Sequence, residues 1–132
     1  MKKKVFLGGT CANSTWRNVL IPQLKIDYFN PVVDNWTPEC QLEEIEQREN
    51  CDFCLYVITP RVQGFYSFAE VADDSNKRPD KTIFCYLAVD GESVFDEKQL
   101  KSLHAIGKMV QDNGGQWFMT LDRVAKYLNE NA

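Results

Sequence analysis

The clearest indication of the fold is the segment Asp52–Ile58, DFCLYVI. It is almost continuously apolar, which is typical of a strand buried on both faces in the middle of a parallel sheet. Four further stretches have strand character: KVFL at Lys4–Leu7, DYFN at Asp27–Asn30, TIFCYLA at Thr82–Ala88 and QWFM at Gln116–Met119. The sequence therefore predicts five strands.

Helical segments separate these strands. A first helix is expected after the capping candidates Asn13 to Thr15, with a break near Pro22. Further helices are expected at Pro38–Arg48, at Ser67–Asn76, from Asp96 to Gly114 and after Thr120. Gln99 would complete a capping box with Asp96. Parallel neighbouring strands need right-handed crossovers through helices. We expect a single domain over residues 1–132, with a five-stranded parallel sheet in the order 2-1-3-4-5 and a three-layer α/β/α, flavodoxin- or Rossmann-like fold.

The composition argues against several classes of function. The 132 residues hold 15 Lys and Arg against 19 Asp and Glu, a net charge of −4, which excludes polymeric nucleic acid as the expected partner. No apolar run approaches the roughly 20 residues of a membrane helix, and MKKKVFLGG is too short for a signal peptide, so a cytoplasmic protein is expected. Cys51 and Cys54 form an isolated C-x-x-C that we interpret as packing thiols, with no metal site.

The predicted strand order places a ligand site between the first and third strands. Ligands of open parallel sheets bind beyond the carboxyl ends of the strands, where the strand order reverses. The bordering loops are Gly8–Thr15 and Thr59–Ser67. In the first loop Gly8 and Gly9 would let the backbone approach a ligand, and the second loop supplies Arg61, Gly64, Tyr66 and Ser67.

Glu70 is the residue best suited to chemistry at this crevice. It falls near the first turn of the helix Ser67–Asn76, where amide dipoles favour an ionised carboxylate by about 0.3–1 kcal/mol and so favour a nucleophile. The alternative is an acidic residue that only stabilises the start of the helix. Asn35 and Trp36 follow the second strand at the same edge, and Trp36 could stack on a flat ligand or pack in the core. Asp52 opens the third strand, at the end opposite the crevice.

Several segments together resemble a known superfamily. They are VFLGGT at 5–10 followed by Thr15-Trp16, FNPVVDNW at 29–36, CDFCLYVITP at 51–60 and, above all, GFYSFAEVADDSNKRPDKTIF at 64–84. The chain resembles the nucleoside 2-deoxyribosyltransferase-like superfamily, in particular its small members. Glu70 matches the glutamate of that family, and Asp52 matches its aspartate in the third strand.

The resemblance implies N-glycosidic chemistry on a nucleoside or a nucleoside 5′-monophosphate. Glu70 would attack C1′ and expel the nucleobase, and a second base or a water would resolve the ester, as in retaining glycosidases. This chemistry needs no cofactor. The resemblance further implies base recognition by Asp52, a conflict with its expected place in the strand, and contacts to the ligand from Gly8, Gly9, Trp16, Asn35 and Trp36.

Two positions depart from the family pattern. Phe6 stands where the family often has a tyrosine, and Gly64 where it has an aspartate six residues before the glutamate. Tyr66 or Ser67 could replace part of that hydrogen bonding, and Arg61 with Ser67 could hold a 5′-phosphate. These departures leave open a second reading, a non-catalytic nucleotide-binding or sensing module.

Two further expectations concern partners and alternatives. Members of the family are often homo-oligomers, and Phe65, Tyr66 and Trp117 are candidate interface residues, with burial in the core as the alternative. A receiver-like signalling domain fits poorly, because Gly-Gly-Thr follows the first strand where clustered acidic residues would be needed.

Overall fold

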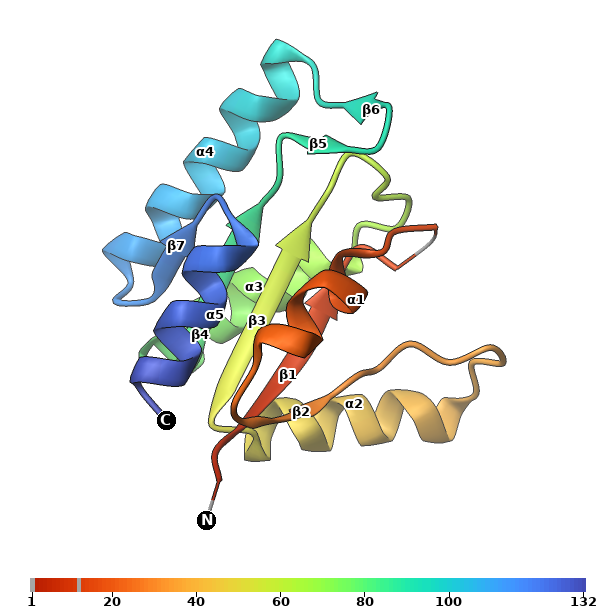
Figure 1. Ribbon diagram of the computed structural model, residues 1–132, viewed down its shortest axis with the longest axis vertical. Helices are drawn as coiled ribbons and strands as arrows, with labels where there is room; N and C mark the ends of the chain where they lie inside the picture. The colour runs from red at the N-terminus through yellow and green to blue at the C-terminus, as the bar shows by residue number, and fades with distance from the viewer. Residues whose placement is uncertain (1, 12) are drawn as a thin grey trace.

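A computed structural model describes residues 2–11 and 13–132. Its central sheet has five parallel strands, in the order β2-β1-β3-β4-β7 (Figure 1). The strands are β1 (Lys4–Gly9), β2 (Asp27–Phe29), β3 (Phe53–Ile58), β4 (Thr82–Tyr86) and β7 (Gln116–Phe118). The predicted number of strands, their order and the three-layer architecture are confirmed.

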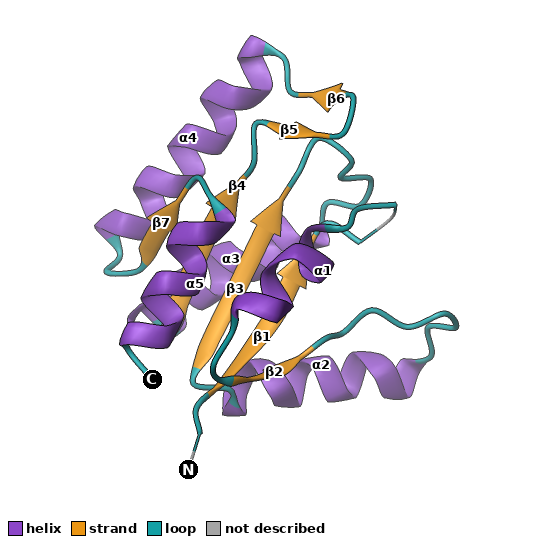
Figure 2. Ribbon diagram, viewed as in Figure 1, coloured by secondary structure: helices purple, strands orange, loops and turns teal. Residues whose placement is uncertain are grey.

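Helices cover both faces of the sheet (Figure 2). One core lies beneath α1 (Trp16–Leu20) and α5 (Leu121–Glu130). The other lies beneath α3 (Tyr66–Lys77) and α4 (Glu97–Asp112), with α2 (Pro38–Asn50) beside them on the same side. Side chains of β3 alternate between the two cores and are all buried, which confirms the interpretation of DFCLYVI.

Short polar signals fix the ends of these helices. Thr37 caps α2, the expected capping box of Asp96 and Gln99 opens α4, and Thr120 caps α5. Pro22 has the expected effect, because α1 ends at Leu20 and continues as the 3₁₀ turn η1 (Ile21–Gln23). A second 3₁₀ turn, η2 (Pro79–Lys81), leads into β4.

A small hairpin was not predicted. The strands β5 (Val89–Asp90) and β6 (Ser93–Val94) pair in antiparallel fashion between β4 and α4. Gly91 takes a φ of +63° in the turn, a conformation that favours glycine. The hairpin lies beyond the carboxyl ends of the strands, above the β1 and β3 loops (Figure 1).

No described helix combines the length and the apolar character that crossing a membrane requires.

Candidate functional site

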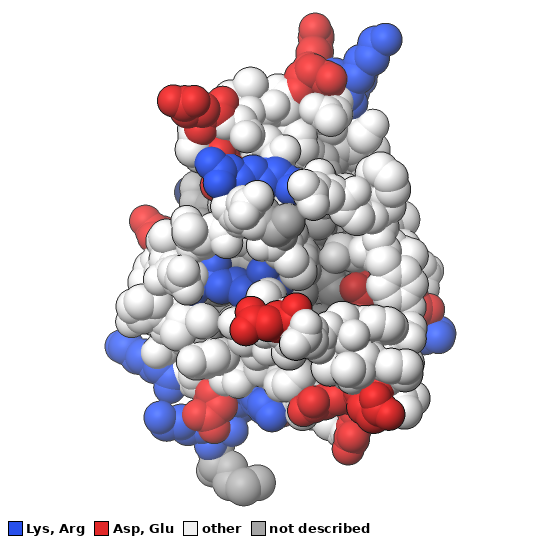
Figure 3. All heavy atoms as spheres, turned by 90° about the vertical axis from the view of Figure 1, so that its right-hand side faces the viewer, with Lys and Arg blue, Asp and Glu red and all other residues white. Residues whose placement is uncertain are grey.

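The loops after β1 and β3 meet at the carboxyl edge of the sheet. The Thr10 amide donates to the Val57 carbonyl and the Thr59 amide donates to the Thr10 hydroxyl, each at 2.9 Å. A cavity of about 250 Å³ lies between the two loops and the start of α3; its lining residues are Gly9, Thr10, Cys11, Val62, Gln63, Gly64, Tyr66 and Ser67. The molecule is hollowed on this side (Figure 3). Four of the expected ligand-binding residues, Gly9, Gly64, Tyr66 and Ser67, therefore come together here.

Gly8 and Gly9 allow two strands to pack closely. The sequence had instead predicted that these glycines let the backbone approach a ligand. A Cβ at Gly9 would lie 2.0 Å from the Val57 carbonyl oxygen, and Gly9 has a φ of +113°. A Cβ at Gly8 would lie 2.8 Å from the Tyr56 ring. Both glycines are thus required for β1 to pack against β3, and of the two Gly9 lines the cavity.

Trp16 supports the first loop and does not line this cavity, which corrects the expectation for it. Its side chain is 3% exposed within the core under α1, and its indole N–H donates to the Thr10 carbonyl at 2.8 Å. The buried Arg17 guanidinium donates to the same carbonyl at 2.7 Å and to the Leu7 carbonyl at 2.8 Å. The residue pair Trp16-Arg17 therefore fixes the loop from beneath.

Arg61 is already paired with the hairpin. Its Nη1 donates to the Asn13 carbonyl at 2.6 Å and its Nε lies 3.7 Å from the Asp90 carboxylate. That contact is to Asp90 Oδ1. The hydroxyls of Ser14 and Thr59 donate to Asp90 Oδ2, each at 2.7 Å. Asp90 thereby joins both loops to the hairpin. A 5′-phosphate at Arg61 would have to compete with this carboxylate.

Glu70 lies in the second turn of α3, because the helix begins at Tyr66. It faces Arg48 of α2, with 3.5 Å between Glu70 Oε2 and Arg48 Nη1, and its side chain is 11% exposed. Burial raises the pKa of Glu70 to about 7; the carboxylates of Glu44 and Asp74 act in the same direction and Arg48 opposes them. Burial thus shifts the pKa of Glu70 in the direction opposite to the one expected from the start of the helix.

The Glu70 carboxylate is accessible although it is largely buried. No hydrogen bond from a described residue reaches it, and among the described residues Trp117 Nε1 is the one fully buried side-chain nitrogen or oxygen without a partner. The oxygens of Glu70 therefore keep contact with solvent. Tyr66 and Ser67 precede Glu70 by one helical turn on the same face of α3, and both line the cavity.

Arg48 and Glu44 are site residues that sequence analysis missed. Arg48 contacts Glu70 and Asp74 on α3, and burial raises the pKa of Glu44 against the opposing effect of Arg48. Their spacing of four residues, which puts both on one face of α2, was the available signal. That signal could not identify α3 as the surface they face.

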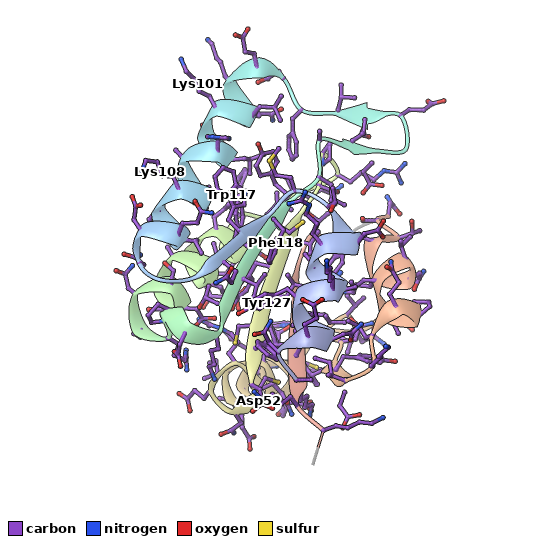
Figure 4. The ribbon with its side chains drawn as sticks, turned by 60° about the vertical axis from the view of Figure 1, so that its left-hand side comes forward. Asp52, Lys101, Lys108, Trp117, Phe118 and Tyr127 are labelled. Carbon is purple, nitrogen blue, oxygen red and sulfur yellow. The ribbon has the colours of Figure 1, made fainter. Side chains whose placement is uncertain are left out.

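Asp52 lies at the opposite edge of the sheet. It immediately precedes β3, is exposed, and accepts a hydrogen bond from the Lys4 amide at 2.9 Å. It lies at the end where β3 begins, away from the hairpin (Figure 4). The structure thus contradicts a catalytic or base-binding role for Asp52 within this chain and supports its expected place in the strand.

Two further expected ligand residues, Asn35 and Trp36, are not among the residues that line the cavity. Asn35 and Trp36 are exposed on the loop between β2 and α2, Trp36 at 58%.

The two positions that depart from the family pattern differ in their surroundings. Phe6 is 2% exposed and stacks on Phe29, with 5.9 Å between the ring centres. Gly64 borders open space, since nothing lies within 4 Å of a Cβ built there.

The candidate interface aromatics divide into two groups. Phe65 and Tyr66 are exposed, at 77% and 61%. Trp117 is half-buried and packs between Tyr86 and His104, which favours packing over an interface role for it.

The thiols of Cys51 and Cys54 are buried as expected, and burial raises the pKa of Cys54 to about 12. Within the described part of the chain no three His, Cys, Asp or Glu side chains gather as a metal site.

The comparisons with known proteins give one family. The model of the family described as "Nucleoside 2-deoxyribosyltransferase like" matches residues 2–87, which include Glu70, Arg48 and every residue lining the cavity. The search of curated proteins returned no match. The chain belongs to the nucleoside 2-deoxyribosyltransferase-like family.

Proposed function

We propose that this protein cleaves or transfers across the N-glycosidic bond of a nucleoside or a nucleoside 5′-monophosphate, with Glu70 as the nucleophile. The observation that carries the proposal is the state of the Glu70 carboxylate, which is 11% exposed yet free of hydrogen bonds from the described residues. A carboxylate of this kind attacks more readily than one that is fully solvated or fully paired. Membership of the family supports the same chemistry.

The reaction would proceed in two steps. A Glu70 oxygen forms a bond to C1′ while the C1′–N bond breaks, and the electron pair of that bond leaves with the nucleobase. A water or a second base then attacks C1′ of the glycosyl ester and releases the Glu70 carboxylate. Water gives hydrolysis and a base gives exchange.

Glu44 is the candidate for the proton of the leaving base. Its carboxyl is half-buried on α2, close enough to Glu70 to raise the pKa of that residue. Burial also raises the pKa of Glu44 itself, which favours a protonated carboxyl able to donate. Glu44 could therefore take the part that Gly64, without a side chain, cannot perform.

A second candidate function is a nucleotide-binding or sensing module without turnover. The observations that favour it are Phe6, whose buried ring carries no hydroxyl, and Gly64, which leaves open space where the family has a carboxylate. The ligand class is the same in both proposals. They differ in whether base release occurs.

The experiment is a base-release assay on nucleosides and their 5′-monophosphates, with and without an added second base. The wild type is compared with Glu70→Gln and with Asp52→Asn, a control carboxylate at the opposite sheet edge. We expect release by the wild type and by Asp52→Asn, and none by Glu70→Gln. Intact-protein mass spectrometry during turnover should detect a glycosyl adduct on the wild type and none on Glu70→Gln. Ligand binding without release by the wild type would favour the sensing module.

A further inference from the structure

We propose that Arg48 is the positioning residue for Glu70, which restricts the orientation of its carboxylate and favours the ionised form that attack requires. The catalytic meaning of this assignment rests on the proposed function. The structural assignment itself rests on the contacts among Arg48, Glu70 and Asp74.

Two of the three guanidinium nitrogens of Arg48 are held by aspartate carboxylates. Its Nη2 donates to Asp74 Oδ1 at 2.9 Å and its Nε donates to Asp74 Oδ2 at 3.3 Å, so two N–H groups hold the guanidinium on one carboxylate. Nη2 also contacts Asp73 at 3.2 Å. The third nitrogen, Nη1, lies 3.5 Å from Glu70 Oε2. The planar fork of an arginine permits this division of donors, and a lysine ammonium does not.

Asp74 is itself fixed from two sides. It is fully buried, accepts from the Tyr56 hydroxyl of β3, and is bound by Arg78 Nη2 at 2.8 Å. Burial raises the pKa of Tyr56, which keeps the hydroxyl protonated as a donor. The sheet thus positions Asp74, Asp74 positions Arg48, and Arg48 positions Glu70.

The charges around Glu70 require such a cation. Glu44 from α2 and Asp74 from α3 both disfavour the ionised form of Glu70, as does burial. The structure pairs Glu70 with one cation within 4 Å, Arg48, among the described residues. Opposite charges at this range lower a carboxyl pKa by about 1 to 3. Without Arg48, Glu70 would be mainly protonated at neutral pH.

The contact joins Glu70 to a guanidinium that is itself fixed in place. Glu70 Oε2 lies 3.5 Å from Arg48 Nη1, and Arg48 Nη2 is held on Asp74 at 2.9 Å. A carboxylate paired with a fixed guanidinium is restricted in its orientation. Arg48 therefore contributes orientation as well as charge.

The test measures Glu70 directly, by ¹³C NMR titration of its carboxyl carbon, assigned by comparison with Glu70→Gln. We expect Arg48→Gln to raise the pKa of Glu70 by about 1 to 3. The low-pH limb of base release should move upward by the same amount. The matched control is Arg78→Gln, which removes the other arginine from Asp74 without a contact to Glu70. The control should cost stability and leave the Glu70 pKa near that of the wild type.

The outcomes separate the two proposals. A Glu70 pKa that is equal in Arg48→Gln and the wild type would overturn the role of Arg48, as would an equal rise in Arg78→Gln. A rise specific to Arg48→Gln, in a protein that releases no base, supports the role of Arg48 and overturns the glycosidic function alone. Should Arg48→Gln not fold, Arg48→Lys decides: we expect a raised Glu70 pKa, and a wild-type value there contradicts the proposal.

Discussion

Gly9 at the end of β1 lies against Val57 of β3 so closely that a Cβ on Gly9 would be 2.0 Å from the Val57 carbonyl oxygen. The neighbouring Thr10 amide donates to that same oxygen at 2.9 Å. The two strands beneath the cavity are therefore joined through a position that accepts no side chain.

Gly9→Ala should strongly destabilise the protein. The added Cβ clashes with backbone, and the φ of +113° is unfavourable for alanine. Together these effects should lower the free energy of unfolding by about 2–5 kcal/mol. The matched control is Gly64→Ala, where open space predicts a change within about 1 kcal/mol. Urea denaturation measures both; similar losses for the two variants would contradict the close approach.

Glu70→Gln should stabilise the protein above neutral pH. The folded-state pKa of Glu70 is raised from 4.5 to about 7, so its contribution to stability is fully present below pH 4.5 and is lost as the pH rises through 7. Above that pH the buried carboxylate costs on the order of 3 kcal/mol, which glutamine removes. Arg48 keeps Asp74 as a partner in the variant.

The measurement for Glu70→Gln is chemical denaturation at pH 4.5 and pH 8. The difference in unfolding free energy between the variant and the wild type should rise with pH. Glu46→Gln, at an exposed position of α2, serves as control and should change stability by less than about 0.5 kcal/mol at either pH. A Glu70→Gln effect that is independent of pH would show that Glu70 ionises without cost.

Gly64→Asp should increase base release. The site accepts a side chain without a clash and lines the same cavity as Tyr66 and Ser67, so the new carboxyl would supply a second proton donor. We expect a gain of about 100-fold in kcat, the lower end of the range of general acid catalysis. Gly64→Asn, which has the same shape without a titratable proton, should show no such gain. Equal rates for the two variants would exclude a proton-transfer role at this position.

Alkylation of Cys11 should block ligand binding. Cys11 is exposed and lines the cavity of about 250 Å³, so an added carboxamidomethyl group would occupy space that the ligand needs. Modification by iodoacetamide should abolish base release, and a bound nucleoside should slow the modification. Cys40, half-buried on α2, is the internal control and should react at the same rate with and without ligand. Cys11→Ser should retain activity after the same treatment; loss of activity there would place the effect elsewhere.

The sheet, its strand order and several helix ends could be predicted from the amino-acid sequence. The apolar run at 52–58, the alternation of strands and helices, and caps such as Thr37 and Asp96 act through residues near one another in the chain. Local patterns of this kind restrict topology to a few choices. The resemblance on residues 64–84 also singled out Glu70, whose place on α3 beside the cavity-lining Tyr66 and Ser67 the structure then defined.

The surroundings of Glu70 could not be predicted from the sequence and depend on how the helices pack. Arg48 and Glu70 are 22 positions apart on different helices, and neither helix carries a signal that names the other. The structure likewise removed Asp52 from the site and placed the hairpin of Asp90 over both loops. Burial and the nearest charges set the pKa of a carboxyl, and both depend on which surfaces meet in space rather than on neighbours in sequence.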